Sequence, residues 1–516
     1  IDQTIPPLGR ENLLEGMDNE VVKAYYSYLV DLAVIFGANK SSAEKEMKDA
    51  LDFEIDLTKI GLSKEERLNV PANLMTIEEM QEKFSKIPWK EFLDNLGDNP
   101  TLEIFPSTDV IVAFSDYPVK LQQLIEKTPK RIQANFLLYQ SLLNSVPYLT
   151  QELRNRELQF SKVKTGITEH KPRWKKCTEL VSKNLKFSAG ALYVRRYFSD
   201  NAKKIVEKLV ADLKETFIEM IKEVDWMDKN TKKEALDKAA AMGAYVAYQP
   251  ELIDDEKLSN YYSQLNTTAD SFLEISMAVR RFLEDTNFEE LQQPFISSFW
   301  IHRTFVASVN AVYRNFQNSL ELSAGILQSP FFSVDRPNYM NYGSIGFVIG
   351  HEITHGFDDK GRRYSKDGSA KNWWEEKTKQ VFIEKAQCII DQYGNFTAPE
   401  VNRNLNGVTT LRENIADNGG IREAYLAYEK WVKINGEEPR LPNLKYSPKQ
   451  LFWISAANSW CTTMKPETLE QQILTNLHAP AKFRILGTLR NSELFSKDFE
   501  CPVGSKMNPV HKCRVW

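Results

Sequence analysis

One short segment of the chain carries the residues best suited to chemistry: His351-Glu352-Ile353-Thr354-His355, the pattern HExxH. On a helix, residues four apart lie on one face about one turn apart, so both imidazoles can reach one metal ion. Glu352 is offset by one position and can hold a water molecule on that metal. Zinc lowers the pKa of its water toward ~7, and a carboxylate can accept the released proton. The pattern therefore predicts zinc-dependent hydrolysis, and a helix that carries two histidines by chance is the alternative.

A zinc centre of this kind needs a third protein ligand, and the sequence offers two candidates. Glu375 lies twenty residues after His355, a spacing used by thermolysin-like enzymes, but its neighbours are more typical of a solvated helix start. Glu413 lies 58 residues after His355, in a segment with a helical stripe of apolar residues. Asp417 is four residues further on, faces the same way, and could accept the second N–H of a ligating histidine. The residues alone leave both candidates open.

The elements that must position these residues are mainly helical. Residues 1–235 show helical periodicity, most clearly over 201–224, where apolar residues recur at steps of three and four. Residues 304–314 alternate with period two, which predicts a strand, and the apolar stretch 320–327 after a polar break makes a hairpin plausible. This change of pattern predicts a domain boundary near residue 235.

Composition narrows the class of protein. Of the 516 residues, 42% are hydrophobic and 26% charged, which is ordinary for a core-forming chain and excludes a disordered one. The 66 basic and 70 acidic residues give a net charge of −4, so the bulk charge does not favour nucleic-acid binding. No apolar run approaches the ~20 residues of a membrane helix. Three glycosylation sequons, at Asn39, Asn266 and Asn395, modestly favour an oxidising compartment.

Three motifs together carry a specific resemblance. GHEITHGFDD (350–359), ENIADNGG (413–420) and the terminal CRVW (513–516) resemble the neprilysin family of zinc metallopeptidases, to which the endothelin-converting enzymes are related. The resemblance implies a mainly α, two-domain zincin of the gluzincin type, with a small β-sheet or hairpin in the catalytic domain and a helical lid domain. We expect the lid at 1–235 and the thermolysin-like zinc catalytic domain at 236–516.

The resemblance also implies roles for individual residues. One Zn²⁺ would be held by His351, His355 and Glu413, which chooses Glu413 over Glu375, and Glu352 would be the general base. Asp417 would orient a zinc histidine, with Asp358 a weaker candidate for a similar role.

Further residues match the family's substrate-contacting positions. His478 would stabilise the transition-state oxyanion, and Arg484 would bind a substrate carbonyl. Asn310 and Ala311 would pair with the peptide backbone as an edge strand does. The apolar S1′ pocket would be formed by Phe331, Phe332, Phe347, Val348 and Trp460.

The cysteines are interpreted in the same way. The resemblance implies a disulfide between Cys388 and Cys513. Family ectodomains are usually longer at the N-terminus, so Cys177, Cys461 and Cys501 would pair with cysteines of a missing N-terminal segment. The expected location is extracellular or on the cell surface, as a membrane-anchored or secreted form, and the oligomeric state is not predicted.

These expectations define the function and its rivals. We expect a zinc endopeptidase that cleaves short peptides on the amino side of hydrophobic residues, with the helical domain excluding folded proteins. An aminopeptidase would need an acidic motif for the substrate's N-terminus upstream of HExxH, and no usual form of it is present. A non-catalytic or incomplete neprilysin-like peptide-binding protein is the alternative from another class.

Overall fold

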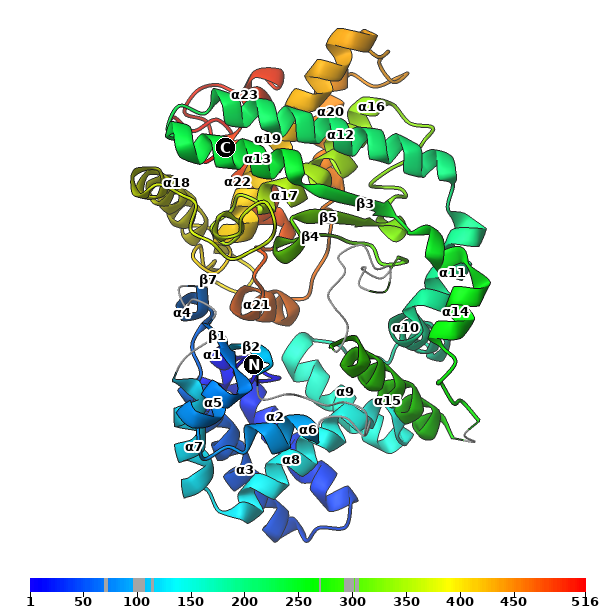
Figure 1. The fold of residues 1–516 in the computed structure, drawn as a ribbon, viewed down its shortest axis with the longest axis vertical. Helices are drawn as coiled ribbons and strands as arrows, with labels where there is room; N and C mark the ends of the chain where they lie inside the picture. Colours follow the sequence, from blue (N-terminus) through cyan, green and yellow to red (C-terminus); the bar gives the residue numbers. More distant parts are fainter. Residues whose placement is uncertain (69–72, 96–106, 113–115, 269–270, 292–300, 302–305) are drawn as a thin grey trace. The chain divides into compact units, whose positions relative to one another are not determined.

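The computed structural model describes residues 1–68, 73–95, 107–112, 116–268, 271–291, 301 and 306–516. Helices make up most of it, and the strands are few and short, which confirms the predicted fold class (Figure 1). None of the described helices is both long and apolar enough to span a bilayer.

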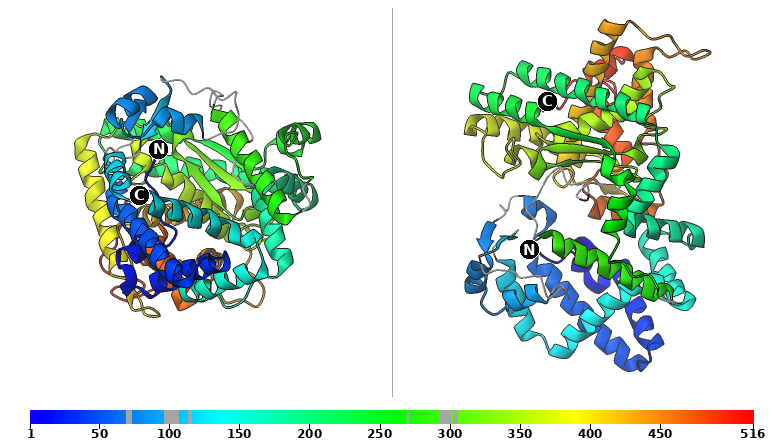
Figure 2. Two further views of the ribbon diagram at one scale, coloured as in Figure 1. Left: turned by 90° about the horizontal axis from the view of Figure 1, so that it is seen from below. Right: turned by 45° about the vertical axis from the view of Figure 1, so that its right-hand side comes forward.

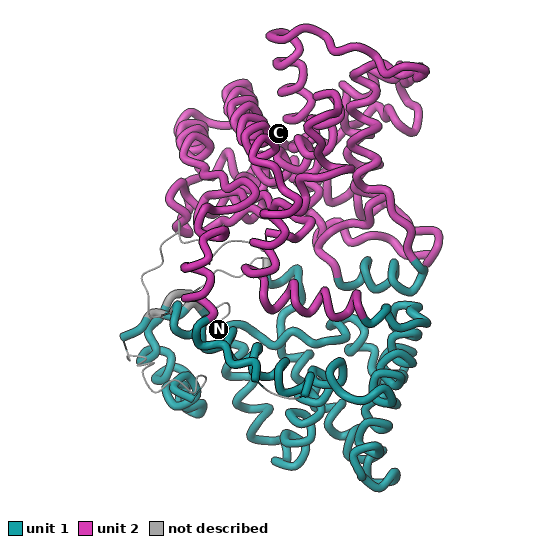
Figure 3. The backbone as a smooth tube through the Cα atoms, turned by 90° about the vertical axis from the view of Figure 1, so that its right-hand side faces the viewer, with its two compact units in different colours: residues 1–173, 263–295, 465–475 teal, residues 174–262, 296–464, 476–516 magenta. Residues whose placement is uncertain are grey.

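The chain forms two compact units that exchange segments along the sequence (Figure 3). Unit 1 comprises residues 1–173, 263–295 and 465–475, and unit 2 comprises residues 174–262, 296–464 and 476–516. This division differs from the single boundary expected near residue 235. The change of pattern in the sequence marks where strands enter the chain, whereas the helices after residue 174 already pack within unit 2. The assignment of 1–235 as a lid and 236–516 as the catalytic domain stays a prediction.

Unit 1 is a helical assembly whose largest core lies among α2, α3, α8 and α9. Asn19 and Asn39 start α2 and α3, because each side chain accepts hydrogen bonds from two backbone N–H groups of the first turn. β1 and β2 form an antiparallel pair. The elements are α1 (Arg10–Leu14), α2 (Glu20–Ile35), α3 (Lys40–Ile60), α4 (Lys64–Leu68), β1 (Asn73–Thr76), α5 (Ile77–Lys83), α6 (Trp89–Asp94), β2 (Asp109–Val112), α7 (Tyr117–Lys127), α8 (Lys130–Ser145), α9 (Gln151–Thr165), α15 (Phe272–Leu291) and α21 (Pro466–Thr475).

Unit 2 combines long helices with a small sheet. Its elements are α10 (Arg173–Asn184, from the unit boundary), α11 (Lys186–Tyr197), α12 (Asp200–Glu223), α13 (Lys229–Ala241), β3 (Gly243–Ala247), α14 (Asp255–Tyr261), β4 (Ala311–Arg314), β5 (Ser319–Ser323), α16 (Asn338–Asn341), α17 (Phe347–His355), α18 (Glu376–Gly394), β6 (Thr397–Ala398), β7 (Arg403–Asn404), α19 (Leu411–Asn435), α20 (Pro448–Asn458), α22 (Ala481–Asn491) and α23 (Glu493–Asp498).

The periodic segment 201–224 is α12, as predicted. Ser199 begins it by accepting a hydrogen bond from the Asn201 N–H, and the apolar stripe is buried. α12 and α13 lie along one side of the sheet (Figures 1 and 2).

The three-stranded sheet of unit 2 has the order β3-β5-β4, and β6 and β7 form a separate antiparallel pair. β4 and β5 form the expected antiparallel hairpin, and β3 adds in parallel to the other edge of β5. The strand predicted over 304–314 is shorter: β4 covers only 311–314, and residues 304 and 305 lie outside the described part. The carbonyls of Ala307 and Ser308 instead approach Gly325, where a Cβ atom would lie 2.4 Å from the Ser308 oxygen.

Candidate metal centre

Two packed helices of unit 2 bring together the residues that the sequence separates. α17 carries His351 and His355, and the first turn of α19 carries Glu413. The helix backbones touch at two glycines: a Cβ on Gly350 would lie 2.6 Å from the Gly420 oxygen, and one on Gly420 would lie 2.3 Å from the His351 nitrogen. Only glycine fits at these positions, and this close approach sets Glu413 beside the histidines.

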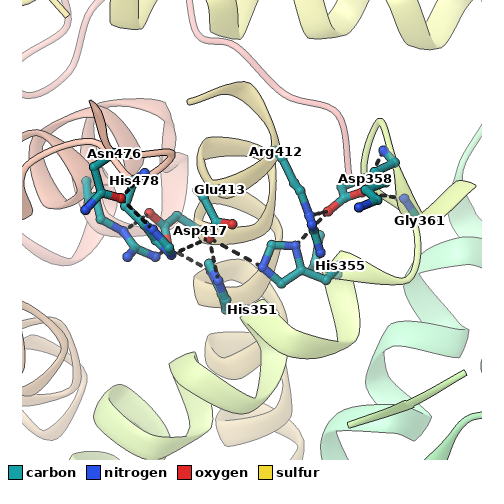
Figure 4. A network of polar contacts seen from close by, with 12 residues as sticks. His351, His355, Asp358, Gly361, Arg412, Glu413, Asp417, Asn476 and His478 are labelled. Carbon is teal, nitrogen blue, oxygen red and sulfur yellow. Dashed lines mark hydrogen bonds and ion pairs between the residues drawn. The ribbon is translucent and has the colours of Figure 1, made fainter. Parts of the chain in front are cut away.

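The three side chains meet at one point (Figure 4). Glu413 Oε2 lies 3.2 Å from His351 Nε2 and 3.4 Å from His355 Nε2, and all three residues are at most 7% exposed. Ligand atoms ~2.0–2.2 Å from one tetrahedral zinc ion would be about 3.3–3.6 Å apart. Within the described residues, Glu413 Oε2 is buried and accepts no hydrogen bond. The two imidazole nitrogens and this carboxylate oxygen therefore fit a zinc ion.

Each histidine is held from behind by a buried aspartate. His351 Nδ1 donates to Asp417 Oδ1 at 2.8 Å, and His355 Nδ1 donates to Asp358 Oδ2 at 2.6 Å. Both aspartates are fully buried. An Nδ1–H that donates to a carboxylate leaves the Nε2 lone pair free to bind a metal and makes it more basic. The sequence named Asp417 for this position and Asp358 more weakly, and the structure places both there.

Each aspartate is in turn paired with an arginine. Arg484 donates to both oxygens of Asp417, each at 2.7 Å, and Arg412 Nε donates to Asp358 Oδ2 at 2.9 Å. Burial opposes the charge of Asp417, but Arg484 outweighs it and holds the pKa of the carboxyl below its ordinary value. The same balance, with Arg412, lowers the pKa of Asp358. Both aspartates therefore stay ionised behind their histidines.

Arg412 was not among the sequence candidates. It directly precedes Glu413, but no pattern in the sequence indicates that its side chain meets Asp358, 54 residues earlier.

The alternative third ligand, Glu375, is not part of the group formed by His351, His355 and Glu413. Glu375 is exposed, begins α18, and accepts a long hydrogen bond of 3.4 Å from Asn230, so it belongs to a solvated helix start away from the metal ligands.

His478 also reaches the centre. Its Nε2 lies 3.1 Å from Glu413 Oε2, while Asn476 Oδ1 lies 3.1 Å from its Nδ1 and accepts its backbone N–H at 2.9 Å. Its side chain is about half exposed, unlike the two ligating histidines. Glu352 is buried on α17 between the two ligands.

Three of the residues predicted to contact substrate lie close together, and the others lie singly. The Arg484 guanidinium lies 3.9 Å from the Trp460 ring, and that ring lies 6.5 Å from Phe347, so these three form one cluster beside the centre. Phe332 is buried, whereas Phe331 and Val348 are half-buried. Asn310 is exposed and directly precedes β4, in which Ala311 is buried. Their roles toward substrate stay predictions.

The disulfide between Cys388 and Cys513 is present, as expected. Cys177, Cys461 and Cys501 form no disulfide within the described residues. The three sequon asparagines are exposed, and their glycosylation stays a prediction.

The fold and the His–His–Glu site define a zinc metallopeptidase. Models of peptidase family M13 match residues 1–249 and 310–515. The chain is 40% identical to neprilysin-2 of Drosophila melanogaster over 100% of its own length and 68% of that protein's. It is 36% identical to human neprilysin, over 97% of this chain and 69% of that protein. It is also 36% identical to an endothelin-converting enzyme homologue of Locusta migratoria, over 100% of this chain and 72% of that protein.

Solved structures agree with these relatives. The zinc metalloprotease Zmp1 of Mycobacterium tuberculosis, in complex with an inhibitor, superposes with a TM-score of 0.87 at 26% identity, covering 97% of this chain and 75% of that one. PepO of Lactobacillus rhamnosis shares the fold, with a TM-score of 0.83 at 22% identity, covering 97% and 76%. The chain therefore belongs to peptidase family M13, the neprilysin family, and is a neprilysin-like zinc metalloendopeptidase.

Proposed function

We propose that this protein hydrolyses short peptides on the amino side of hydrophobic residues. The observation that carries the proposal is the convergence of His351, His355 and Glu413 with Glu352 on the same helix. An apolar cluster next to this centre, which includes Phe347 and Trp460, supports a preference for a hydrophobic side chain on the substrate.

The residues divide the chemistry among them. When bound, zinc supplies a Lewis acid for the scissile carbonyl and acidifies the attacking water. Glu352 takes a proton from the attacking water and delivers it to the leaving nitrogen. His478 donates a hydrogen bond to the oxyanion that forms on the carbonyl. Loss of one such donor typically lowers the rate by ~10²–10³-fold.

Substrate binding is proposed along β4. In the described part of the chain β4 pairs with β5 alone, so its other edge offers unpaired backbone groups to an extended peptide. Asn310 stands exposed at the start of this edge and would bind the peptide backbone together with Ala311. Arg484 would bind a substrate carbonyl from its place between Asp417 and Trp460.

The protein is proposed to work outside the cell or at its surface. A disulfide between Cys388 and Cys513 and three exposed sequons, at Asn39, Asn266 and Asn395, support an oxidising, glycosylating compartment.

The test is turnover of an internally quenched peptide with a blocked N-terminus and one hydrophobic residue at the expected P1′ position. Glu352→Gln should keep one zinc per chain and lose activity by at least ~10³-fold, while the exposed control Glu375→Gln should match the parent. Parental turnover in Glu352→Gln would reject Glu352 as the base. Failure of the zinc-loaded parent to cleave any such peptide would favour a non-catalytic peptide-binding protein.

A further inference from the structure

A buried lysine, which lies far from the zinc motif in the sequence, contacts the turn that follows the motif, residues 356–364. Lys238, on α13, is 1% exposed. Its Nζ donates to the carbonyl oxygens of Gly356 at 2.7 Å, Gly361 at 2.8 Å and Tyr364 at 2.7 Å. An ammonium group has three N–H donors, and all three are used on one turn of the chain.

That turn connects the zinc helix to Asp358. It begins at Gly356, directly after the ligand His355, and it lies tightly on the helix end: a Cβ on Gly361 would be 1.9 Å from the His355 oxygen. Asp358 Oδ1 accepts the N–H of Gly361 at 2.6 Å and that of Lys360 at 2.8 Å. The backbone of Gly361 therefore joins the two sides, since its N–H binds the aspartate and its carbonyl binds Lys238.

The charge of Lys238 is compensated by nearby dipoles and by the more distant charge of Asp358. None of the described carboxylates lies within ion-pair distance of its Nζ. The ammonium lies at the C-terminal end of α17, where the helix dipole is negative. It also lies over the rings of Phe357, at 5.3 Å, and Trp373, at 5.9 Å. Burying a charge is costly unless its surroundings compensate it. Burial lowers the pKa of Lys238 to about 7, so its protonated form near neutral pH depends on the three carbonyls that converge on it, and this requirement fixes the shape of the turn.

We propose that Lys238 is a positioning residue of the zinc centre: its ammonium group holds the turn 356–364 so that Asp358 stays behind His355. Arg412, on α19, contacts the Asp358 side chain, and Lys238 holds the backbone of the turn that carries Asp358. This inference concerns zinc binding and is independent of the peptide specificity proposed above.

The test measures zinc affinity in the full chain by competition with a chelator, with thermal unfolding as a check of folding. Changes to the partners behind zinc ligands typically weaken metal binding by ~10–100-fold. Lys238→Met should weaken zinc binding by about 10-fold. Lys238→Gln, which keeps two N–H donors without the charge, should lose less. The matched control is Lys214→Met, because Lys214 is a half-buried lysine of unit 2 whose Nζ donates to the Met242 oxygen at 2.5 Å. It should bind zinc as the parent does.

A double-mutant cycle distinguishes positioning from general support of the fold. If Lys238 acts through Asp358, Lys238→Met should change zinc affinity by less than about twofold once Asp358→Asn is present. Equal losses in both backgrounds, or parental affinity in both Lys238 variants, would overturn the proposal. If neither Lys238 variant folds, the lysine has a purely structural role, and the proposal is also rejected.

Discussion

Replacing Asp417 with asparagine probes the link between one zinc ligand and the buried charge behind it. Asp417 Oδ1 accepts from His351 Nδ1 at 2.8 Å and from Arg484 Nη2 at 2.7 Å, and Oδ2 accepts from Arg484 Nε at 2.7 Å. An asparagine has one acceptor oxygen and an NH₂ group, so at least one of these donors would face another donor. The substitution therefore removes the charge and breaks a hydrogen bond while preserving the shape.

The structure sets the scale of the loss. Asp417 is fully buried and Arg484 is 5% exposed, so the guanidinium would lose its counter-charge in the interior. Removing one partner of a buried ion pair typically costs about 3–5 kcal/mol of stability. Loosening the hydrogen bond behind His351 should weaken zinc binding by about 10–100-fold, which is about 1.4–2.7 kcal/mol.

The assay combines urea unfolding of the metal-free protein with chelator competition for zinc. Asp498→Asn is the control, because Asp498 accepts hydrogen bonds from Tyr425 at 2.7 Å and Trp453 at 2.8 Å in the same unit but contacts no zinc ligand. We expect the control to keep parental zinc affinity. An Asp417→Asn protein with parental stability and with zinc affinity within twofold of the parent would refute the reasoning.

Three further predictions concern the protein around the centre. Burial raises the pKa of Glu423 well above its ordinary value, and within the described residues neither carboxylate oxygen has a hydrogen-bond partner. The unfolded chain releases this proton at a lower pH than the folded chain does, so the free energy of unfolding falls as pH rises above ~4.3. In urea unfolding, Glu423→Gln should equal the parent near pH 4 and be the more stable protein at pH 8. A difference in stability that does not change with pH would contradict this. Gly420→Ala should push α19 away from His351 and lower zinc affinity in a chelator titration at least tenfold, so unchanged affinity would show that the helix contact is not needed. Cys388→Ser removes a disulfide that joins residues 125 apart in the sequence, and it should lower the free energy of unfolding by about 5 kcal/mol. Cys461→Ser, which removes a cysteine without a disulfide, is the control. Equal stability of the two variants would contradict this prediction.

The local parts of this protein could be predicted from its sequence. HExxH has the spacing that puts two imidazoles on one helix face, and α17 has that form. The apolar stripe over 201–224 is buried in α12, because helical periodicity reports directly on the face that packs. The resemblance to the neprilysin family chose Glu413, which the residues alone had left in competition with Glu375.

The long-range parts could not be predicted. The segment 465–475 belongs to unit 1 although its neighbours belong to unit 2, and no local pattern reports such an exchange. Lys238 lies 118 residues before Gly356, and a lysine on a helix usually faces solvent, so its burial against the zinc turn became visible only in the fold. The contact of Arg412 with Asp358 could not be predicted either, because it joins residues 54 positions apart in the sequence.

The most direct test of the zinc centre is the metal content of two glutamate variants after extensive dialysis. The parent and Glu375→Ala should each retain one zinc per chain, because Glu375 is exposed at the start of α18. Glu413→Ala should retain much less than one, since it removes the oxygen that lies 3.2 Å from His351 Nε2 and 3.4 Å from His355 Nε2. Full zinc occupancy in Glu413→Ala, or its loss in Glu375→Ala, would contradict the assignment of the centre.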